Sequence, residues 1–349
     1  MADAFSGAEN VVCQIVAMYR HDPDTEMLFC GVEGDNIRAA LECRHVPFVP
    51  IAVRSPKEVA RVIRKVQPDI IHAHDMKASL FAALTCGKIP LISHIHNNNY
   101  DSRILSLKAV AYAFAACKAK HIFWVSQSAY EGYALRRCFA EKSSILYNVI
   151  DIDEVRKRAA MDTAEYCYDI VYVGRLTYSK NPERLMDVLA AIAKRCPTMK
   201  AAVIGTGELL DAVEKKRQAL HLEDCVDLLG YCTNPYKIIR SARLMLMTSR
   251  WEGLPMCALE AMALGVPIVS TPADGLAELI EEGCTGFLRK NNDELADAAV
   301  SLLTDDMLYN RLHDAVSSRA VSLLDCGAYK AALDKVYQQC ARKADEPHA

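Results

Sequence analysis

The sequence lacks an apolar run long enough to cross a lipid bilayer. A membrane-spanning helix needs about 18 or more consecutive residues with few or no charges, and no uncharged stretch approaches that length. The printed sequence also opens without a signal-peptide pattern, and it contains no short internal repeat or low-complexity segment. These absences predict a folded cytoplasmic chain that is soluble or peripheral at a membrane.

A strong net charge is also absent. The chain has 41 Lys and Arg against 44 Asp and Glu, a formal charge of −3, which gives no reason to expect a general nucleic-acid binder. The first 150 residues carry a small basic excess and the remainder an acidic one. This asymmetry would suit a first half that faces an anionic membrane.

Paired cysteines are missing, although cysteine itself is abundant. None of the 14 cysteines stands in a Cys-x-x-Cys pair, and most lie inside apolar runs, as Cys13, Cys86, Cys117 and Cys257 do. A cysteine in such a run behaves as a small hydrophobic residue. We therefore expect a reduced chain without a disulfide framework, as is usual in the cytoplasm.

The sequence does contain a regular alternation of short apolar segments and amphipathic segments. This alternation is typical of parallel α/β sheets, in which helices cover buried strands. The expected strands are Met27–Val32, Phe48–Val53, Asp69–Ala73, Pro90–His96, His121–Ser126, Ser144–Asn148, Asp169–Gly174, Lys200–Gly205, Val226–Leu229, Leu244–Thr248, Pro267–Ser270 and Gly286–Arg289. The clearest helices are Asn10–Tyr19, Lys57–Lys65, Ile104–Lys118, Pro182–Arg195, Glu208–Leu220 and Ala328–Lys343.

The series of strands restarts after a hinge near Val149–Glu154, which predicts two doubly wound units in tandem. Ligands of such sheets bind at the carboxyl ends of the strands, so a cleft between the units is the expected ligand site. One expected strand is absent, because the chain passes from Met1–Ser6 almost directly into a helix. Either the chain as given lacks some N-terminal residues or the sheet is rearranged, and we favour the first.

The segment Trp251–Ser270 carries the most specific signal for a ligand. Pro255 suits the first turn of a helix, and Gly265 followed by Pro267 ends that helix. The N–H groups of Met256–Ala258 would project from the helix start, where the helix dipole favours an anion.

Two glutamates flank this helix start. Glu252 lies in the preceding loop and Glu260 on the second turn, so a diphosphate there would have a carboxylate on each side for sugar hydroxyls. Taken singly, Glu260 is better explained as a solvated helix residue and Glu252 as a partner of the helix dipole. Only together with neighbouring motifs do they indicate a ligand site.

Two further loops follow expected strands. Arg175 comes directly after a strand, and Lys180 stands just before a helix that begins at Pro182. Two cations at the carboxyl edge of a sheet suit a diphosphate, because each charge-assisted hydrogen bond contributes about 1.5–3 kcal/mol. The loop with Gly205 and Gly207 either lets backbone approach a ligand or makes a tight strand-to-helix turn.

These segments resemble the retaining glycosyltransferases of family 4, which have the GT-B fold of two facing Rossmann-like domains. The family's Glu-x7-Glu motif matches Glu252 and Glu260, and its Gly-Arg-Leu…Lys-Asn segment matches Gly174–Leu176 and Lys180–Asn181. The resemblance covers nearly the whole chain and is strongest over Asp169–Leu288.

The resemblance implies roles for the matching residues. Arg175 and Lys180 are expected to hold the donor diphosphate, Glu260 to bind the nucleotide ribose, and Glu252 to contact the donor sugar. The backbone of Gly230, Tyr231 and Cys232 is expected to meet the nucleotide base. The other expected contacts to the nucleotide sugar are Gly7, Gly174, Gly205, Gly207, Met256, Cys257 and Ala258.

The resemblance also divides the chain by function. Residues 1–150 would form the acceptor-side domain, residues 151–322 the donor domain, and residues 323–349 a helix that crosses back to the first. The expected reaction moves a hexose or N-acetylhexosamine from a nucleoside diphosphate sugar, by default a UDP-sugar, to a glycan or lipid-linked hydroxyl. We expect retained configuration and no metal or other cofactor. A phosphorylase or epimerase of the same fold, or a non-catalytic nucleotide-sugar-binding partner subunit, are the alternatives.

In the first half, Ser6–Glu9 resembles the family's Gly-Gly-Ala-Glu loop, with serine in place of the first glycine. Gly7 would let backbone come close to donor or acceptor, unless the segment is an ordinary entry into a helix.

Two histidine pairs, His72-Ala-His74 and His94-Ile-His96, stand at strand ends. Alternate residues of a strand share a face, so each pair could reach one metal ion. Such histidines are more often satisfied packing residues, which is our expectation for all but His96. By resemblance, His96 donates to hydroxyls of the donor sugar, and Asn97–Asn99 line the acceptor side.

Asp22-Pro-Asp24 and Asp151-Ile-Asp153 resemble the metal-binding Asp-x-Asp of a different glycosyltransferase fold. We expect turn and capping roles for them, which argues against a metal. The apolar segment Arg103–Lys120 has basic ends and is either a core-packed helix or a contact with an anionic membrane.

Overall fold

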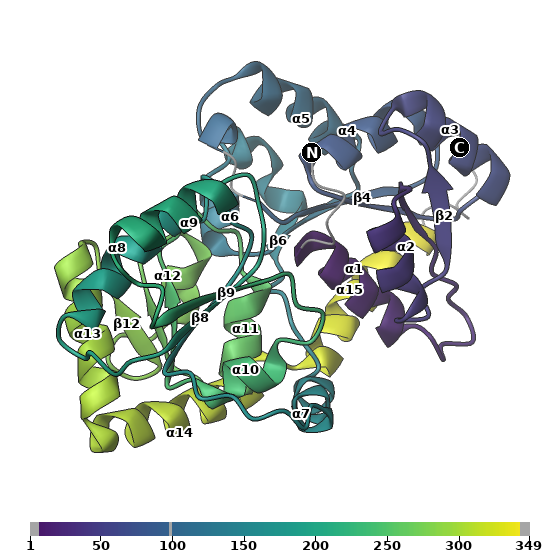
Figure 1. Ribbon diagram of the computed structural model, residues 1–349. Coiled ribbons are helices and arrows are strands. Elements are labelled where there is room, and N and C mark those ends of the chain that lie inside the picture. The colour runs from purple at the N-terminus through teal and green to yellow at the C-terminus, as the bar shows by residue number, and fades with distance from the viewer. Residues whose placement is uncertain (1–6, 98–99, 343–349) are drawn as a thin grey trace. The chain divides into compact units, whose positions relative to one another are not determined.

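The computed structural model describes residues 7–97 and 100–342, which form two compact units. The first unit takes in Met1–Asn148 and Cys326–Ala349, and the second takes in Val149–Asp325. The chain therefore returns to the first unit for its last helix, within three residues of the position expected from the sequence. Figure 1 labels the elements along the chain.

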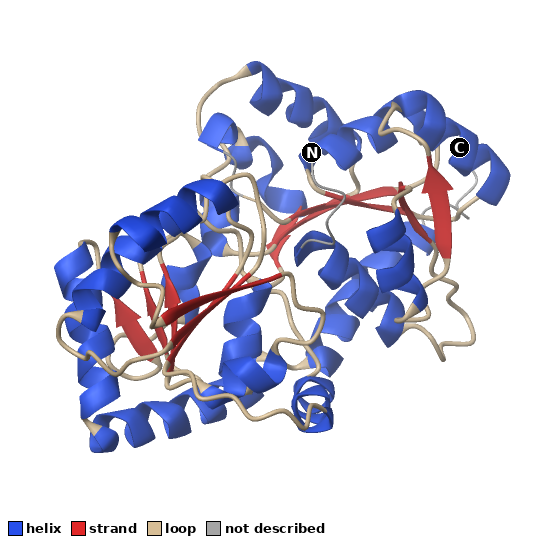
Figure 2. Ribbon diagram, in the orientation of Figure 1, coloured by secondary structure: helices blue, strands red, loops and turns tan. Residues whose placement is uncertain are grey.

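The second unit is a parallel six-stranded sheet in the order β12-β11-β10-β7-β8-β9, and helices flank it (Figure 2). Its strands are β7 (Ile170–Val173), β8 (Ala201–Ile204), β9 (Val226–Gly230), β10 (Leu244–Met247), β11 (Ile268–Ser270) and β12 (Gly286–Leu288). Its helices are α7 (Ile152–Met161), α8 (Pro182–Ala193), α9 (Leu210–Ala219), α10 (Tyr236–Ser241), α11 (Met256–Ala263), α12 (Gly275–Leu279), α13 (Asn292–Thr304) and α14 (Asp306–Leu323).

The strand order of this sheet reverses between β7 and β10, which pair directly. In a doubly wound sheet this reversal is the switch point beside which ligands bind. The loops that leave β7 and β10 at their carboxyl ends are those that contain the Lys180 and Glu252 motifs. The order of the strands therefore brings together two segments that are distant in the sequence.

The first unit contains two separate parallel sheets, β1-β2 and β3-β4-β5-β6. Its strands are β1 (Phe29–Val32), β2 (Phe48–Ile51), β3 (Ile71–His74), β4 (Leu91–Ile95), β5 (His121–Trp124) and β6 (Ser143–Ile145). Its helices are α1 (Gly7–Met18), α2 (Asp35–Glu42), α3 (Pro56–Val66), α4 (Met76–Thr85), α5 (Leu107–Lys118), α6 (Gln127–Glu131) and α15 (Cys326–Arg342), with short 3₁₀ turns at Tyr100–Ser102 and Arg136–Lys142. Among the described residues, β1 pairs only with β2 and β3 only with β4.

The hydrophobic core of the second unit explains why its central strands read as continuous apolar runs. All four residues of β8 and all four of β10 are buried, because helices cover both faces of a parallel sheet. Leu185 and Leu189 of α8 pack into the same core. The α/β fold with two Rossmann-like units is confirmed, and all the expected strands are present with ends that differ by a few residues.

Candidate functional site

A buried ion pair lies at the switch point of the second unit. The Lys180 Nζ atom is 2.5 Å and 2.7 Å from the two carboxylate oxygens of Glu252. The side chains are only 17% and 7% exposed. Burial alone would lower the pKa of Lys180, but the adjacent Glu252 carboxylate outweighs it, so the pKa lies above its ordinary value.

Two residues that the sequence analysis missed hold Glu252 in place. The hydroxyl of Ser249 donates to Glu252 Oε1 at 2.6 Å, and the backbone N–H of Glu252 donates to Asp274 Oδ2 at 3.2 Å. Asp274 has a φ of +45°, a left-handed conformation that costs free energy in a residue other than glycine. Ser249 lies three residues before Glu252 in the loop after β10, whereas Asp274 follows β11, so only the Asp274 contact depends on the order of the strands.

The start of α11 lies in the same region. Pro255 is its N-cap residue and forms no side-chain cap, while the N–H of Ala258 donates to the Pro255 carbonyl at 3.1 Å. The N–H of Ala258 is therefore used within the helix, and the expected anion site keeps only the N–H groups of Met256 and Cys257. Burial raises the pKa of the Cys257 thiol to about 12, with Lys180 opposing that shift, so the thiol is neutral at physiological pH.

Glu260 is not a solvated helix residue. It is buried on α11, at 8% exposure, and accepts a hydrogen bond from the hydroxyl of Tyr236 at 3.3 Å. A carboxylate that is nearly removed from water carries a large desolvation cost unless polar partners surround it. The role of Glu260 at the nucleotide ribose stays a prediction.

The loop after β7 presents the two expected cations differently. The Arg175 side chain is exposed, and its charge opposes the rise in the pKa of Lys180 that Glu252 causes. The backbone of Lys180 belongs to a turn, because its N–H donates to the Thr177 carbonyl at 3.0 Å. Asn181 then adopts a φ of 55° before Pro182 begins α8.

The glycines of the expected nucleotide loops pack mainly against the protein's own backbone. A Cβ atom on Gly205 would lie 1.9 Å from the carbonyl oxygen of Gly174, and one on Gly207 would lie 2.3 Å from that of Leu176. The Gly205 N–H also donates to the Gly230 carbonyl at 2.7 Å. Glycine is thus required by close packing of neighbouring loops.

The segment expected at the nucleotide base follows β9. Gly230 has a φ of +67° and ends the strand. Tyr231 is 60% exposed, and Cys232 is partly buried. An exposed aromatic ring such as that of Tyr231 is a surface on which a base can stack.

In the first unit, His96 follows β4 and is 6% exposed. Its Nε2 lies 2.8 Å from Nδ1 of His74, and its backbone N–H donates to Asp75 Oδ1 at 3.2 Å. Burial lowers the pKa of His96 to about 3 and raises that of Asp75 to about 6. Gly7 opens α1, whereas Ser6, Asn98 and Asn99 lie outside the described residues.

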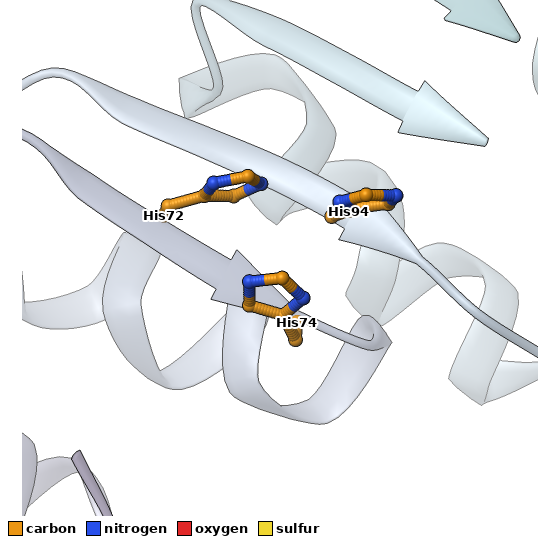
Figure 3. Close-up of side chains that lie close together, drawn as sticks. All are labelled: His72, His74 and His94. Carbon is orange, nitrogen blue, oxygen red and sulfur yellow. The ribbon is translucent and has the colours of Figure 1, made fainter. Parts of the chain in front are cut away.

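The other three histidines correct the sequence-based expectation. His72, His74 and His94 lie together on β3 and β4 (Figure 3), and burial lowers the pKa of each far below its ordinary value. Among the described residues, neither ring nitrogen of His94 and not Nε2 of His72 has a hydrogen-bond partner. His72 and His94 are therefore not the satisfied packing residues that we expected, whereas His74 is paired with His96.

The two Asp-x-Asp segments have the expected local roles. Asp22 accepts a hydrogen bond from the Asp24 N–H at 3.2 Å in a turn, and Asp151 caps α7 by accepting from the Glu154 N–H at 3.0 Å. The 14 cysteines all lie within the described residues, and none is in a disulfide. No helix in the described part of the chain combines the length and apolar character needed to cross a membrane.

Two family models match consecutive parts of the chain. Residues 5–154 match Glycosyltransferase Family 4, and residues 154–319 match Glycosyl transferases group 1. The poly(glycerol-phosphate) alpha-glucosyltransferase of Bacillus subtilis is 25% identical over 63% of this chain and 33% of its own length. The UDP-Gal:alpha-D-GlcNAc-diphosphoundecaprenol alpha-1,3-galactosyltransferase of Escherichia coli is 22% identical over 87% of this chain and 86% of its own.

The aligned part spans about a third of the Bacillus subtilis relative and 58% of an uncharacterized glycosyltransferase of Methanocaldococcus jannaschii. Among solved structures, Anabaena HepE in complex with UDP has a TM-score of 0.80 at 20% identity, covering 96% of this chain and 98% of its own. The apo lipopolysaccharide outer core galactosyltransferase WaaB has a TM-score of 0.68 at 19% identity, covering 97% of each chain.

The doubly wound units and their structural neighbours define a protein of the GT-B fold. The chain belongs to the glycosyltransferases of family 4.

Proposed function

We propose that this chain transfers a hexose or N-acetylhexosamine from a nucleoside diphosphate sugar, most simply a UDP-sugar, to a hydroxyl of a glycan or lipid-linked acceptor. The configuration at the anomeric carbon is retained, and the donor diphosphate is neutralised by protein groups without a metal ion. The observation that carries this proposal is the convergence of Lys180, Glu252 and the start of α11 at the switch point of the second sheet.

The charges at this point suit a departing diphosphate. Lys180 is buried and remains cationic because its pKa is raised, Arg175 is exposed after β7, and the first N–H groups of α11 add the positive end of a helix dipole. Fixed donors of this kind stabilise charge that develops in the transition state. The second unit therefore acts on the leaving group.

The reaction requires one bond to form and one to break on the same face of the sugar. The acceptor oxygen bonds to the anomeric carbon as the bond from that carbon to the phosphate oxygen breaks. The acceptor proton passes to the departing phosphate, which becomes the nucleoside diphosphate product. In this proposal Glu252 binds the donor sugar, Glu260 binds the ribose, and the ring N–H of His96 donates to a sugar hydroxyl.

The test is thermal unfolding with UDP, GDP, ADP and their sugars, each with and without EDTA. One nucleotide series should raise the unfolding temperature by several degrees, unchanged by EDTA, and Glu260→Gln should reduce the rise. NMR of the product of that donor should show retained anomeric configuration. An absence of any shift, or an inverted product, would contradict the proposal.

We also propose that the first unit docks on an anionic membrane surface to reach a lipid-linked acceptor. Leu107, Val110 and Phe114 lie along one side of α5 at 90%, 52% and 43% exposure, and Leu105 in the preceding loop is 73% exposed. Ala109, Tyr112, Ala115 and Ala116 are the residues of α5 that are buried instead. An apolar helix face beside basic residues is typical of an interfacial helix.

A further inference from the structure

Three imidazoles lie together on β3 and β4 of the first unit. His74 pairs in register with His94, and His72 stands two residues earlier on β3. Each offers a ring nitrogen, and the three atoms lie within 4.8 Å of one another. Figure 3 shows the rings of the two strands grouped on one side of the sheet.

The ring nitrogens at this point lack protein partners in the described part of the chain. His94 is completely buried, and both of its ring nitrogens are without a hydrogen bond, as is Nε2 of His72. A buried polar atom with no partner costs about 1–3 kcal/mol, and such atoms are rare in native structures. Three of them on neighbouring side chains indicate that something other than the protein satisfies them.

The remaining nitrogens of the other two imidazoles are held by the protein. Nδ1 of His72 is 2.7 Å from the hydroxyl of Tyr337 on α15, and Nδ1 of His74 is 2.8 Å from Nε2 of His96. In both His72 and His74, Nδ1 is therefore held by a protein hydrogen bond, and Nε2 is the nitrogen that can bind a metal. This is the arrangement found around metal-binding histidines, where a partner on the second nitrogen sets the tautomer and orients the ring.

We propose that His72, His74 and His94 bind one transition-metal ion of the zinc class in the first unit. Three neutral nitrogen ligands favour Zn²⁺, Ni²⁺ or Cu²⁺ and do not suit Mg²⁺ or Ca²⁺, which prefer oxygen. Tetrahedral zinc holds its nitrogens roughly 3.4 Å apart at bonds of about 2.0–2.1 Å, so small side-chain rotations close the site. Three protein ligands leave the fourth position to water.

The metal fixes the direction of hydrogen bonding toward His96. With Nε2 of His74 on the metal, the proton of that ring is on Nδ1 and is donated to Nε2 of His96. His96 then carries its own proton on Nδ1, a buried atom without a partner among the described residues. A donor at Nδ1 is what a sugar hydroxyl needs; this consequence rests on the proposed function, whereas the metal site does not.

The test uses the full chain, purified without a polyhistidine tag and stripped with EDTA. Titration with Co²⁺ should produce the visible absorption of a tetrahedral ion at one equivalent, and Zn²⁺ should displace it. His94→Asn should weaken Zn²⁺ binding by more than about tenfold, and Tyr337→Phe should weaken it by about tenfold through the orientation of His72. His121→Gln, on β5 of the same sheet, should leave Zn²⁺ affinity unchanged.

Two measurements keep the result unambiguous. Circular dichroism of each variant checks that it is folded, and near-ultraviolet thiolate bands would reveal binding by one of the free cysteines instead. Failure of the folded wild-type chain to bind Zn²⁺ and Co²⁺, thiolate bands at one equivalent, or equal affinity in folded His94→Asn would overturn the metal site. Nucleotide-induced stabilisation of the second unit, measured separately, would be unaffected by any of these outcomes.

Discussion

Lys180 and Glu252 are 72 residues apart in the sequence, yet the lysine amine contacts both oxygens of the carboxylate in a buried ion pair. The lysine follows β7 and the glutamate follows β10, the two strands at which the sheet order reverses. A donor diphosphate would compete with the carboxylate for the same amine. The pair therefore links the stability of the second unit to the site that we propose for the donor.

The first prediction concerns the cost of breaking this pair. Lys180→Met or Glu252→Gln alone should lower the free energy of unfolding by about 3–5 kcal/mol at most, because each leaves one partner without its counter-charge. The double variant should lose less than the sum of the single losses. Urea unfolding measures all three. The more exposed pair Lys216–Asp187, with side chains 27% and 39% exposed, is the control. It should contribute about 0–1 kcal/mol, and additive losses at the Lys180–Glu252 pair would contradict the prediction.

The second prediction separates two roles in catalysis. Lys180→Met should lower kcat by about 100-fold or more, because its charge acts on the leaving diphosphate in the transition state. Glu260→Gln should mainly weaken nucleotide binding, by roughly 10- to 100-fold, because ribose contacts are equal in the ground state and transition state. Steady-state kinetics with nucleotide competition distinguishes them. An equal fall in kcat for both variants would remove the distinction.

The third prediction compares two glycines of the expected nucleotide loops. Gly205→Ala should be strongly destabilising, since its Cβ would lie 1.9 Å from the Gly174 carbonyl oxygen and its φ is +139°. Gly230 also has a positive φ, of +67°, but the Cβ atom added by Gly230→Ala would meet no atom within 4 Å. It should cost only about 1–2 kcal/mol. Thermal unfolding of both variants measures the two losses of stability. A larger loss for Gly205→Ala would show that the steric clash outweighs backbone strain, and equal losses would contradict the prediction.

The periodicity of apolar residues was sufficient to predict the fold. Strands that are buried on both faces, such as β8 and β10, read as short apolar runs, and Pro182, Gly265 and Pro267 mark where helices begin or end. Local signals of this kind survive in a single sequence because each depends on a few neighbouring residues.

Partners that depend on the order of strands could not be predicted in the same way. Asp274 supports Glu252 from the loop after β11, 22 residues further along the chain, and no spacing rule connects the two. The histidine cluster could not be predicted for the same reason. Each His-x-His pair is visible in the sequence, but the packing of His72 beside His94 depends on the register of β3 with β4. Burial and lost hydrogen bonds become apparent only after that register is known.

The fourth prediction concerns acidification. Burial lowers the pKa of His121 to about 4, below the ordinary value of 6.5, so the unfolded chain takes up a proton between these values that the folded chain does not. The free energy of unfolding should therefore fall as the pH drops from about 6.5 to 4. His121→Gln in EDTA-treated protein should make this dependence less steep without removing it, because the buried histidines of β3 and β4 also have lowered pKa values. Unfolding temperatures measured across this pH range provide the test.

The final prediction concerns the exposed face of α5. Leu107→Glu should weaken binding to vesicles that contain anionic lipid by about tenfold or more, because burying a leucine contributes about 1.5–3 kcal/mol and the new carboxylate is repelled. Met307→Glu is a matched control, since Met307 is also a highly exposed apolar residue, at 85%, but lies on α14 of the second unit. Vesicle flotation compares the two variants, and the wild-type interaction should weaken as salt is raised. Equal binding by Leu107→Glu and wild type would mean that this face does not contact the membrane, because 90% exposure makes Leu107 the first side chain that a lipid surface would meet.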